Sequence, residues 1–279
     1  MDISSVAENA RRFRDLHRPG QPLVLFNVWD AVSARIVEQA GYRALATGSA
    51  AVAWTQGFPD GEHISRKQML EAVSRIVRAV AVPVSADLEA AYGLTVRDAA
   101  ATARGAIEAG AAGLNFEDTG EPGKLIDLDL QCERIEAMVE TGARLGVPLV
   151  INARTDVFIA GGAADAQTRM EEAIRRGNRF LQAGAGCVFV LGVSDEESIA
   201  RLAREIKGPL NVFATAKTPP VSRLAQLGVA RVSIGPAGLA HALAHVRRAA
   251  QRLREEGTFE FAADRISGDE LNALFVPKG

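Results

Sequence analysis

The stretch Glu108-Ala-Gly110-Ala-Ala-Gly-Leu-Asn-Phe116 shows the pattern from which the fold can be predicted. A helix-like segment ends at Gly110, and an apolar, strand-like segment follows at once. Glycine adopts the left-handed backbone conformation that closes a helix, which other residues resist. The same arrangement recurs at 39–47, 182–190 and 226–234. This repetition predicts a chain in which helices alternate with buried strands.

A second arrangement places a proline directly before a strand, at Pro83, Pro148 and Pro209. Proline cannot extend the preceding helix, and it favours extended backbone before it. Helical periodicity fills most of the gaps between strands. The helices are predicted at, for example, 64–80, 95–109 and 164–183. The strands are predicted near 23–27, 44–48, 83–87, 113–116, 149–153, 187–191, 210–213 and 231–234.

About eight β–α units in 279 residues favour an α/β fold, a single (β/α)8 TIM barrel over residues 1–256. The strands are nearly all apolar, as expected where both faces of a sheet are covered. A doubly wound open sheet is the alternative. It is disfavoured because no G-x-G-x-x-G motif follows the first strand and no Walker A sequence occurs.

Residues 257–279 are predicted to form a separate tail. Within it, 267–275 is predicted to be a short helix, with Ser267 as the N-cap and Glu270 at the capping-box position. The apolar residues of this helix need a surface to cover. That surface is either a partner subunit or the outer wall of the chain's own barrel.

The composition is that of a soluble globular protein, with 48% hydrophobic and 24% charged residues and a formal net charge of -2. The lack of a basic excess argues against nucleic acid or an anionic membrane as a partner. The first residues lack the apolar segment of a signal peptide. Cys132 and Cys187 match no zinc or redox spacing and are interpreted as structural. We therefore expect a cytoplasmic location.

Three predicted strands, near 83–87, 113–116 and 149–153, end in charge. Their ends carry Asp87 and Glu89, Glu117 and Asp118, and Arg154. In (β/α)8 barrels the carboxyl ends of the strands form the active site. Carboxylates are oxygen ligands suited to Mg²⁺ or Mn²⁺, and the planar guanidinium group can hold a carboxylate or phosphoryl group. The alternative is that these acids pair with arginine or cap helices.

Other strand ends supply weaker candidates. The small residues of Thr47-Gly-Ser-Ala-Ala51 could cradle a carboxylate with their backbone N–H groups. Asn27 and Trp29 could line the pocket wall, although Trp29 could equally pack at the rim. Asn211 follows the start of the seventh strand. Lys217 lies beyond that strand and could form a Schiff base.

These residues belong to a set of motifs that resembles the isocitrate lyase / phosphoenolpyruvate mutase superfamily. The resemblance spans roughly residues 20–250, and the order of the motifs is more specific than any one of them. The motifs are Asn27-x-x-Asp-Ala-x-Ser33-Ala-Arg35, Thr47-Gly-Ser49, Gly57-x-x-Asp60, Asp87-x-x-x-x-Tyr92-Gly93, Glu117-Asp118 and Ala153-Arg154-Thr-Asp156.

The resemblance implies a modified barrel whose last helix is swapped between the subunits of a dimer or tetramer. It also implies Mg²⁺ (or Mn²⁺) and a small 2-oxo acid or related carboxylate as ligands. By resemblance, Asp87 binds the metal, while Asp60 and Glu117 commonly act through water. The carboxylate cradle corresponds to Ser49, Ala50 and Ala51, and the substrate-binding arginine to Arg154.

The stretch after Glu117 departs from the lyases of this superfamily. Those lyases carry a Lys-Lys/Arg-Cys-Gly-His loop, whereas residues 117–126 contain no Cys and no His. Ser85 replaces an Asp that many members carry, and Glu89 is a candidate to compensate. The usual route of isocitrate cleavage is therefore disfavoured. Phosphonopyruvate rearrangement is also disfavoured, because strand six ends Val190-Leu191-Gly192-Val193 without the His-Ser pair of the members that carry it out. The loop 118–127 is still predicted to act as a lid.

Together these observations predict a Mg²⁺-dependent lyase-type enzyme that cleaves a C–C or P–C bond of a small 2-oxo or 2-hydroxy carboxylate through an enolate. One alternative is a 2-oxo acid binding protein with little or no lyase activity. Another is a metal-independent Schiff-base aldolase that uses Lys217. The predicted catalytic residues are Arg154, Glu117 and Glu89; the substrate-binding residues are Trp29, Ser49, Ala50, Ala51, Asp87, Arg154 and Asn211; and the metal ligands are Asp87, Glu117 and Asp60.

Overall fold

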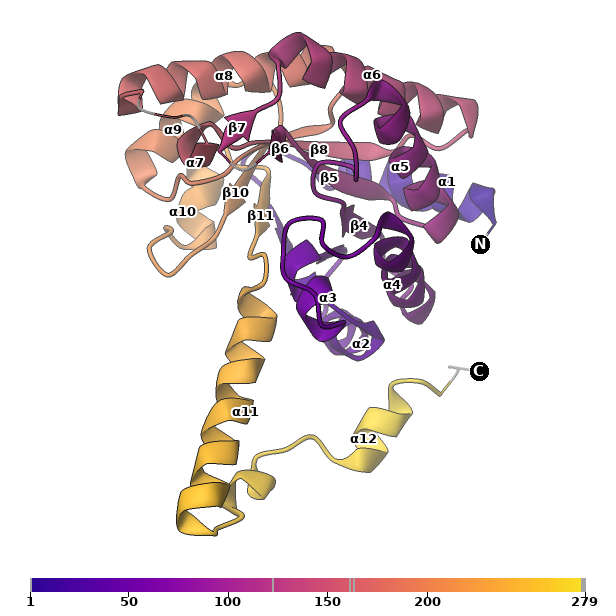
Figure 1. Ribbon diagram of the computed structural model, residues 1–279, viewed down its shortest axis with the longest axis vertical. Helices are drawn as coiled ribbons and strands as arrows, with labels where there is room; N and C mark the ends of the chain where they lie inside the picture. The colour runs from indigo at the N-terminus through magenta and orange to yellow at the C-terminus, as the bar shows by residue number, and fades with distance from the viewer. Residues whose placement is uncertain (1, 122, 161, 163, 277–279) are drawn as a thin grey trace.

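The computed structural model describes residues 2–121, 123–160, 162 and 164–276 (Figure 1). Its main sheet is parallel throughout and runs in the order β1-β11-β10-β9-β8-β5-β4-β3-β2. The strands are β1 (Leu23–Leu25), β2 (Asn27–Val28), β3 (Leu45–Thr47), β4 (Val84–Asp87), β5 (Gly113–Glu117), β8 (Val150–Thr155), β9 (Cys187–Val190), β10 (Leu210–Phe213) and β11 (Arg231–Ser233).

The sheet closes on itself because β1 and β2 are two halves of one strand, interrupted at Phe26. β1 pairs with β11, and β2 pairs with β3. The result is an eight-stranded (β/α)8 barrel, as the sequence predicts. The alternative prediction of a doubly wound open sheet is wrong. The predicted strands agree with the observed ones to within one or two residues at each end.

Helices follow the strands and cover the outside of the barrel (Figure 1). Gly41, Gly110, Gly184 and Gly228 all have positive φ values where a helix ends before a strand, which confirms the helix–glycine–strand pattern. No helix of the described segments is long and apolar enough to span a membrane. The helices are α1 (Ile3–Asp15), α2 (Ala31–Gln39), α3 (Ser49–Thr55), α4 (Arg66–Ala79), α5 (Val96–Ala109), α6 (Leu128–Arg144), α7 (Val157–Ala160), α8 (Ala166–Gln182), α9 (Glu196–Glu205), α10 (Val221–Gln226), α11 (Ala237–Glu256) and α12 (Gly268–Ala273), with a 3-10 turn at Glu260–Ala263.

The register of the paired strands fixes which side chains face the barrel interior. Directly paired residues share a face of the sheet, and side chains alternate along each strand. Hydrogen bonds from Arg231 Nη2 and Asn152 Nδ2 to Asn115 Oδ1, at 3.1 and 2.8 Å, show that this shared face is the interior. The inward-facing set is Asp87, Asn115, Glu117, Asn152, Arg154, Cys187, Phe189, Asn211, Phe213, Arg231 and Ser233.

The amino-terminal end of the barrel is filled by residues on and just after α1. The Phe13 ring lies against Gly113 and 5.7 Å from the guanidinium of the fully buried Arg231. The His17 ring nitrogen Nδ1 bonds to the Phe13 carbonyl at 2.8 Å. Burial, and then the charge of Arg231, lower the pKa of His17 to about 3.

His17 should therefore make the protein less stable in mild acid. Its folded-state pKa lies below the ordinary 6.5, so the unfolded chain takes up the proton first as the pH falls below 6.5. Between pH 7.5 and 5.5 the wild type should lose about 1.4 kcal/mol more unfolding free energy than His17→Leu. Urea unfolding at both pH values measures this difference. A matched change of the exposed His245 to Leu should keep the wild-type loss, and equal losses in wild type and His17→Leu would contradict the prediction.

The last helix of the barrel, α11, stands away from the barrel wall, and the tail then returns towards it (Figure 1). Along α11, Leu243, Val246 and Leu253 are exposed. The tail ends against α2, where Arg35 Nε donates to the Leu274 carbonyl at 2.6 Å and the Leu274 side chain is buried. The end of the tail therefore contacts the outer wall of its own barrel at Leu274, while Phe259, Ile266 and Phe275 remain exposed. Its helix α12 begins as predicted, with Ser267 as the N-cap.

Candidate active site

Asp87, at the end of β4, is held from several sides. Its Oδ2 accepts hydrogen bonds from the backbone N–H and the hydroxyl of Ser49, at 3.0 and 2.9 Å. Its backbone N–H donates to Thr47 Oγ1 at 2.8 Å, and Asn115 Nδ2 lies 3.5 Å from Oδ1. Within the predicted cradle at 47–51, Ser49 is the residue that donates, and in this structure it holds the Asp87 carboxylate. Binding of a substrate carboxylate by Ser49, Ala50 and Ala51 stays a prediction. Ala50 and Ala51 follow Ser49 in the first turn of α3, where both are buried.

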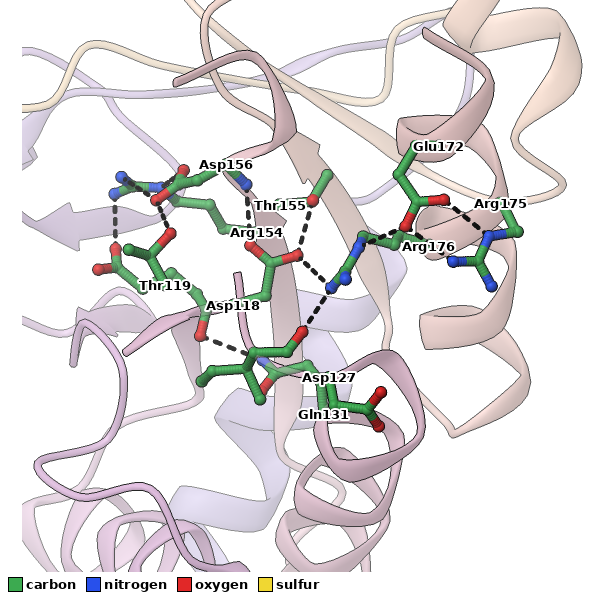
Figure 2. Close-up of polar contacts among 12 residues, drawn as sticks. Asp118, Thr119, Asp127, Gln131, Arg154, Thr155, Asp156, Glu172, Arg175 and Arg176 are labelled. Atoms are coloured by element: carbon green, nitrogen blue, oxygen red, sulfur yellow. Dashed lines mark hydrogen bonds and ion pairs between the residues drawn. The ribbon is translucent and has the colours of Figure 1, made fainter. Parts of the chain in front are cut away.

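Arg154, at the end of β8, lies between two carboxylates (Figure 2). Its Nη1 is 2.7 Å from Glu117 Oε2, and its Nε and Nη2 donate to the two oxygens of Asp156 at 2.6 and 2.9 Å. Asp156 is also held by the Thr119 hydroxyl at 2.9 Å. Burial acts to lower the pKa of Arg154, but Glu117 and Asp156 raise it above its ordinary value. The guanidinium is therefore a fixed positive charge facing the mouth of the barrel.

The charge of Asp87 contributes to raising the pKa values of the other predicted acids, Glu89, Asp60 and Glu117. Burial, followed by the charges of Asp87 and Asp60, raises the pKa of Glu89 to about 8. Burial and Asp87 likewise raise the pKa of Asp60. Burial raises the pKa of Glu117 well above its usual value, although Arg154 opposes this rise. The structure therefore brings acids from two strand ends, and Asp60 from the connection between α3 and α4, into one interacting group.

The donor set of this group fits a hard cation. The buried Glu89 Oε1 has no hydrogen-bond partner, while Oε2 accepts from the backbone N–H of Glu62 at 2.8 Å. Within the described residues, no three acidic, His or Cys groups are close enough to form a metal-binding cluster. Mg²⁺ needs few protein ligands, because it keeps several waters and binds through one or two carboxylates. The assignment of Asp87, with Asp60 and Glu117, as metal ligands remains a prediction.

Asp118 does not join this group, contrary to the expectation that it supplies an oxygen ligand at the site. Its buried carboxylate accepts from Thr155 Oγ1 at 2.7 Å and the Asp156 backbone N–H at 2.9 Å, and it pairs with Arg176 at 3.1 Å (Figure 2). Because side chains alternate along a strand, Glu117 faces the interior and its neighbour Asp118 cannot. The Asp118 carbonyl also accepts from the Ile126 N–H at 2.7 Å.

Asp118→Ala should therefore destabilise the fold. It removes the fully buried carboxylate from Arg176, which keeps only its pair with Glu172 at 2.8 Å. It also leaves the Thr155 hydroxyl and the Asp156 N–H without their buried acceptor, and together these losses should cost about 3–5 kcal/mol. Chemical unfolding measures the change in free energy. Asp129→Ala is the matched control, because Asp129 pairs with Arg179 on the exposed surface. A loss below about 1 kcal/mol for Asp118→Ala, as for an exposed pair, would contradict a structural role.

The hairpin β6 (Thr119–Glu121) and β7 (Lys124–Leu125) occupies the predicted lid loop 118–127. Pro122, which the lid prediction included, lies outside the described residues. The root of the hairpin is fixed on both sides. Thr119 bonds to Asp156, and the Ile126 carbonyl accepts from Arg176 Nη1 at 3.0 Å. Movement of this loop as a lid stays a prediction.

A buried arginine that the sequence reasoning missed, Arg134 on α6, organises the loop that carries Glu89. Arg134 Nη2 donates to the carbonyls of Ala90 and Gly93, the latter at 2.6 Å. Glu89 itself has a φ of 49°, in the left-handed region that non-glycine residues rarely adopt. These bonds hold the strained loop in place. A lone charge among the buried positions of a helix is the signal that could have revealed Arg134.

The remaining predicted residues lie around or beneath the mouth. Trp29 packs at the rim, where a Cβ on Gly238 of α11 would lie 3.4 Å from its ring. Asn211 is buried below the mouth, and its Nδ2 lies 3.2 Å from Ser233 Oγ. Their binding of substrate stays a prediction. Lys217 is exposed on the loop after β10, which gives the Schiff-base alternative no buried site.

The sequence model of the phosphoenolpyruvate phosphomutase family matches residues 13–254. The chain belongs to this family. An oxaloacetate decarboxylase of Pseudomonas entomophila (strain L48) is 30% identical in sequence to this chain. The match covers 95% of this chain and 90% of the decarboxylase. The crystal structure of 2,3-dimethylmalate lyase, a PEP mutase/isocitrate lyase superfamily member, matches with a TM-score of 0.81, 26% identity and coverage of 97% and 94% of the two chains.

A structure of oxaloacetate acetylhydrolase in complex with its product oxalate matches with a TM-score of 0.83 and 26% identity, covering 95% of this chain and 93% of that one. The resemblance drawn from the motifs is therefore confirmed, and so is the fold. The chain is a member of an enzyme family whose named relatives include lyases that act on small carboxylates.

Proposed function

We propose that this protein is a Mg²⁺-dependent lyase that cleaves a C–C or P–C bond of a small 2-oxo or 2-hydroxy carboxylate. The observation that carries the proposal is the charged half-circle at the mouth of the barrel. There Arg154 faces Glu117 at 2.7 Å, and Asp87 stands on the strand next to that of Glu117. A fixed cation beside a cation-binding acid matches a ligand that has a carboxylate and an adjacent oxygen.

The chain's own residues have distinct parts in this reaction. Arg154 holds the ligand's oxygen atom that becomes the enolate oxygen. When the C–C or P–C bond breaks, Arg154 stabilises the negative charge that develops on this oxygen. Asp156 holds Arg154 in position through two hydrogen bonds. Glu89 and Glu117 are the groups placed to carry a proton, since the pKa of each is raised. A bound Mg²⁺, held by Asp87 with Asp60 and Glu117, would supply Lewis-acid stabilisation of the same oxyanion.

A substrate screen tests this proposal. Oxaloacetate, 2-methylisocitrate, phosphonopyruvate and related acids are incubated with the enzyme and Mg²⁺, and products are followed by NMR. We expect turnover of at least one acid that disappears on chelation of the metal. If no acid were turned over although Mg²⁺ and oxalate bound measurably, the proposal of lyase activity would be rejected.

That same outcome would support the second candidate, a 2-oxo acid binding protein. The observation in its favour is the sequence at 117–126, which contains neither the Cys nor the His of the lyase loop. In that case Arg154 and Asp87 would retain a binding role, and calorimetry would detect Mg²⁺-dependent ligand binding without product.

We further propose that the protein is a homo-oligomer in which α11 packs on a partner subunit. Its exposed residues Leu243, Val246 and Leu253 recur at helical spacing and form one apolar stripe. A stripe of this kind is normally covered.

Val246→Glu should therefore shift the protein from a dimer or tetramer towards the monomer, because it places a charge in the covered stripe. Light scattering after size exclusion measures the mass. Arg248→Glu is the matched control, since two residues along a helix lie on nearly opposite sides. A wild-type protein that is monomeric at micromolar concentration would contradict the proposal.

A further inference from the structure

The inward-facing strand ends form a ring around the mouth of the barrel, and its two sides differ in chemistry. On one side lie the charged residues Asp87, Glu117 and Arg154. The next strand beyond Arg154 is β9, whose Phe189 pairs with Arg154 in the sheet register. The Arg154 guanidinium lies 6.0 Å from the centre of the Phe189 ring. The ring of residues therefore changes from ionic to aromatic at Arg154.

The aromatic side continues across the next strand. The ring of Phe213, on β10, stacks on that of Phe189 with 6.5 Å between centroids and 17° between planes. The other edge of Phe213 lies against Gly235, where a Cβ would come within 2.5 Å of Phe213 Cε2. The Gly235 N–H in turn donates to Asn27 Oδ1 at 2.9 Å, which links this side back to the first strand. The aromatic pair thus spans the part of the ring opposite Asp87.

Among the described residues, the inward-facing side chains of β9 and β10 carry no charge. Ser233, the inward residue of β11, lies within hydrogen-bonding distance of Asn211 in the interior. Arg231 of β11 is fully buried, and its Nη2 donates to Asn115 Oδ1. Apart from this buried arginine, the described inward-facing residues of β9, β10 and β11 include no cation.

We propose that Phe189 and Phe213 are specificity-determining residues that select a 2-oxo or 2-hydroxy acid with an apolar chain beyond C3. This inference rests on the proposed function, because it takes the charged side as the place where the carboxylate and its adjacent oxygen bind. A second carboxylate or a phosphonate placed against the two rings would lose its hydration and would gain no charged or hydrogen-bonding partner there. An apolar substituent gains affinity from the same surface.

Calorimetry with a ligand series tests the inference in the presence of Mg²⁺. Oxalate is the reference, because it has no chain and reports on the charged side alone. From pyruvate to 2-oxobutyrate to 2-oxopentanoate, affinity should rise about fourfold for each added methylene. The dicarboxylate 2-oxoglutarate should bind at least about tenfold more weakly than 2-oxopentanoate. Oxalate binding with a flat series, or with a preference for 2-oxoglutarate, overturns the inference alone.

A lack of binding by oxalate and by every 2-oxo acid overturns the proposed function, and the inference with it. Variants then locate the effect. Phe213→Ser should reduce the gain in affinity from pyruvate to 2-oxopentanoate to less than about twofold, whereas Phe213→Leu, which stays apolar, should keep most of it. Phe261→Ser is the matched control, because Phe261 is an exposed aromatic of the tail. An unchanged chain-length gain in a folded Phe213→Ser would contradict the role given to Phe213.

Discussion

Asp87→Asn should reduce metal-dependent turnover on the order of 10³-fold and abolish measurable Mn²⁺ binding. The change keeps the shape of the side chain but removes the charge that a cation requires. The position of Asp87 is also fixed, by both donors of Ser49 and by Thr47. A neighbouring acid therefore cannot take its place without rearrangement of the loop after β3.

The effect of this substitution can be separated from misfolding. Mn²⁺ binding is measured by electron paramagnetic resonance and turnover by product formation, with thermal unfolding as a check on the fold. Asp195→Asn is the matched control. Asp195 is the N-cap of α9, outside the barrel mouth, and asparagine is an equally good N-cap. If Asp87→Asn kept Mn²⁺ affinity close to that of the wild type, Asp87 would not be the main metal ligand.

Arg154→Lys should weaken oxalate binding by about 100-fold or more, although it preserves the positive charge. The guanidinium uses Nε and Nη2 to hold Asp156 and Nη1 to face Glu117. A lysine ammonium is a single point, so it cannot hold Asp156 with the same fork and also present a donor to the ligand. The loss should therefore appear in binding and in turnover together.

Calorimetry with oxalate and Mg²⁺ measures this loss. Arg175→Lys is the matched control, because Arg175 makes a similar fork to Glu172 on the outer face of α8. Its oxalate affinity should equal that of the wild type. An oxalate affinity close to that of the wild type for Arg154→Lys would show that the ligand is not held by this guanidinium.

The strand ends are the part of the site that sequence patterns predicted well. Glycine and proline mark where each strand begins, so the residues at its carboxyl end can be counted directly. Asp87, Glu117 and Arg154 were predicted in this way, and the register places all three on the inward face of adjacent strands. The prediction for Asp118 was wrong, because one residue of difference along a strand reverses the direction of the side chain.

The supporting residues could not be predicted from local patterns. Arg134 reaches the Ala90 and Gly93 carbonyls from more than 40 positions away along the chain. Asp156 belongs to one of the sequence motifs, but its two bonds to Arg154 depend on how the chain turns after β8. Each of these contacts depends on closure of the barrel.

The sequence by itself determined the eight β–α units, the family and the identity of the charged strand ends, because these depend on local backbone preferences and on residue order. The tertiary structure decided which charges face one another. It turned Asp118 into a buried partner of Arg176 and set Phe189 and Phe213 opposite Asp87. The physical reason is that closure of the sheet brings distant strand ends within a few ångströms, where burial and pairing fix the role of each side chain.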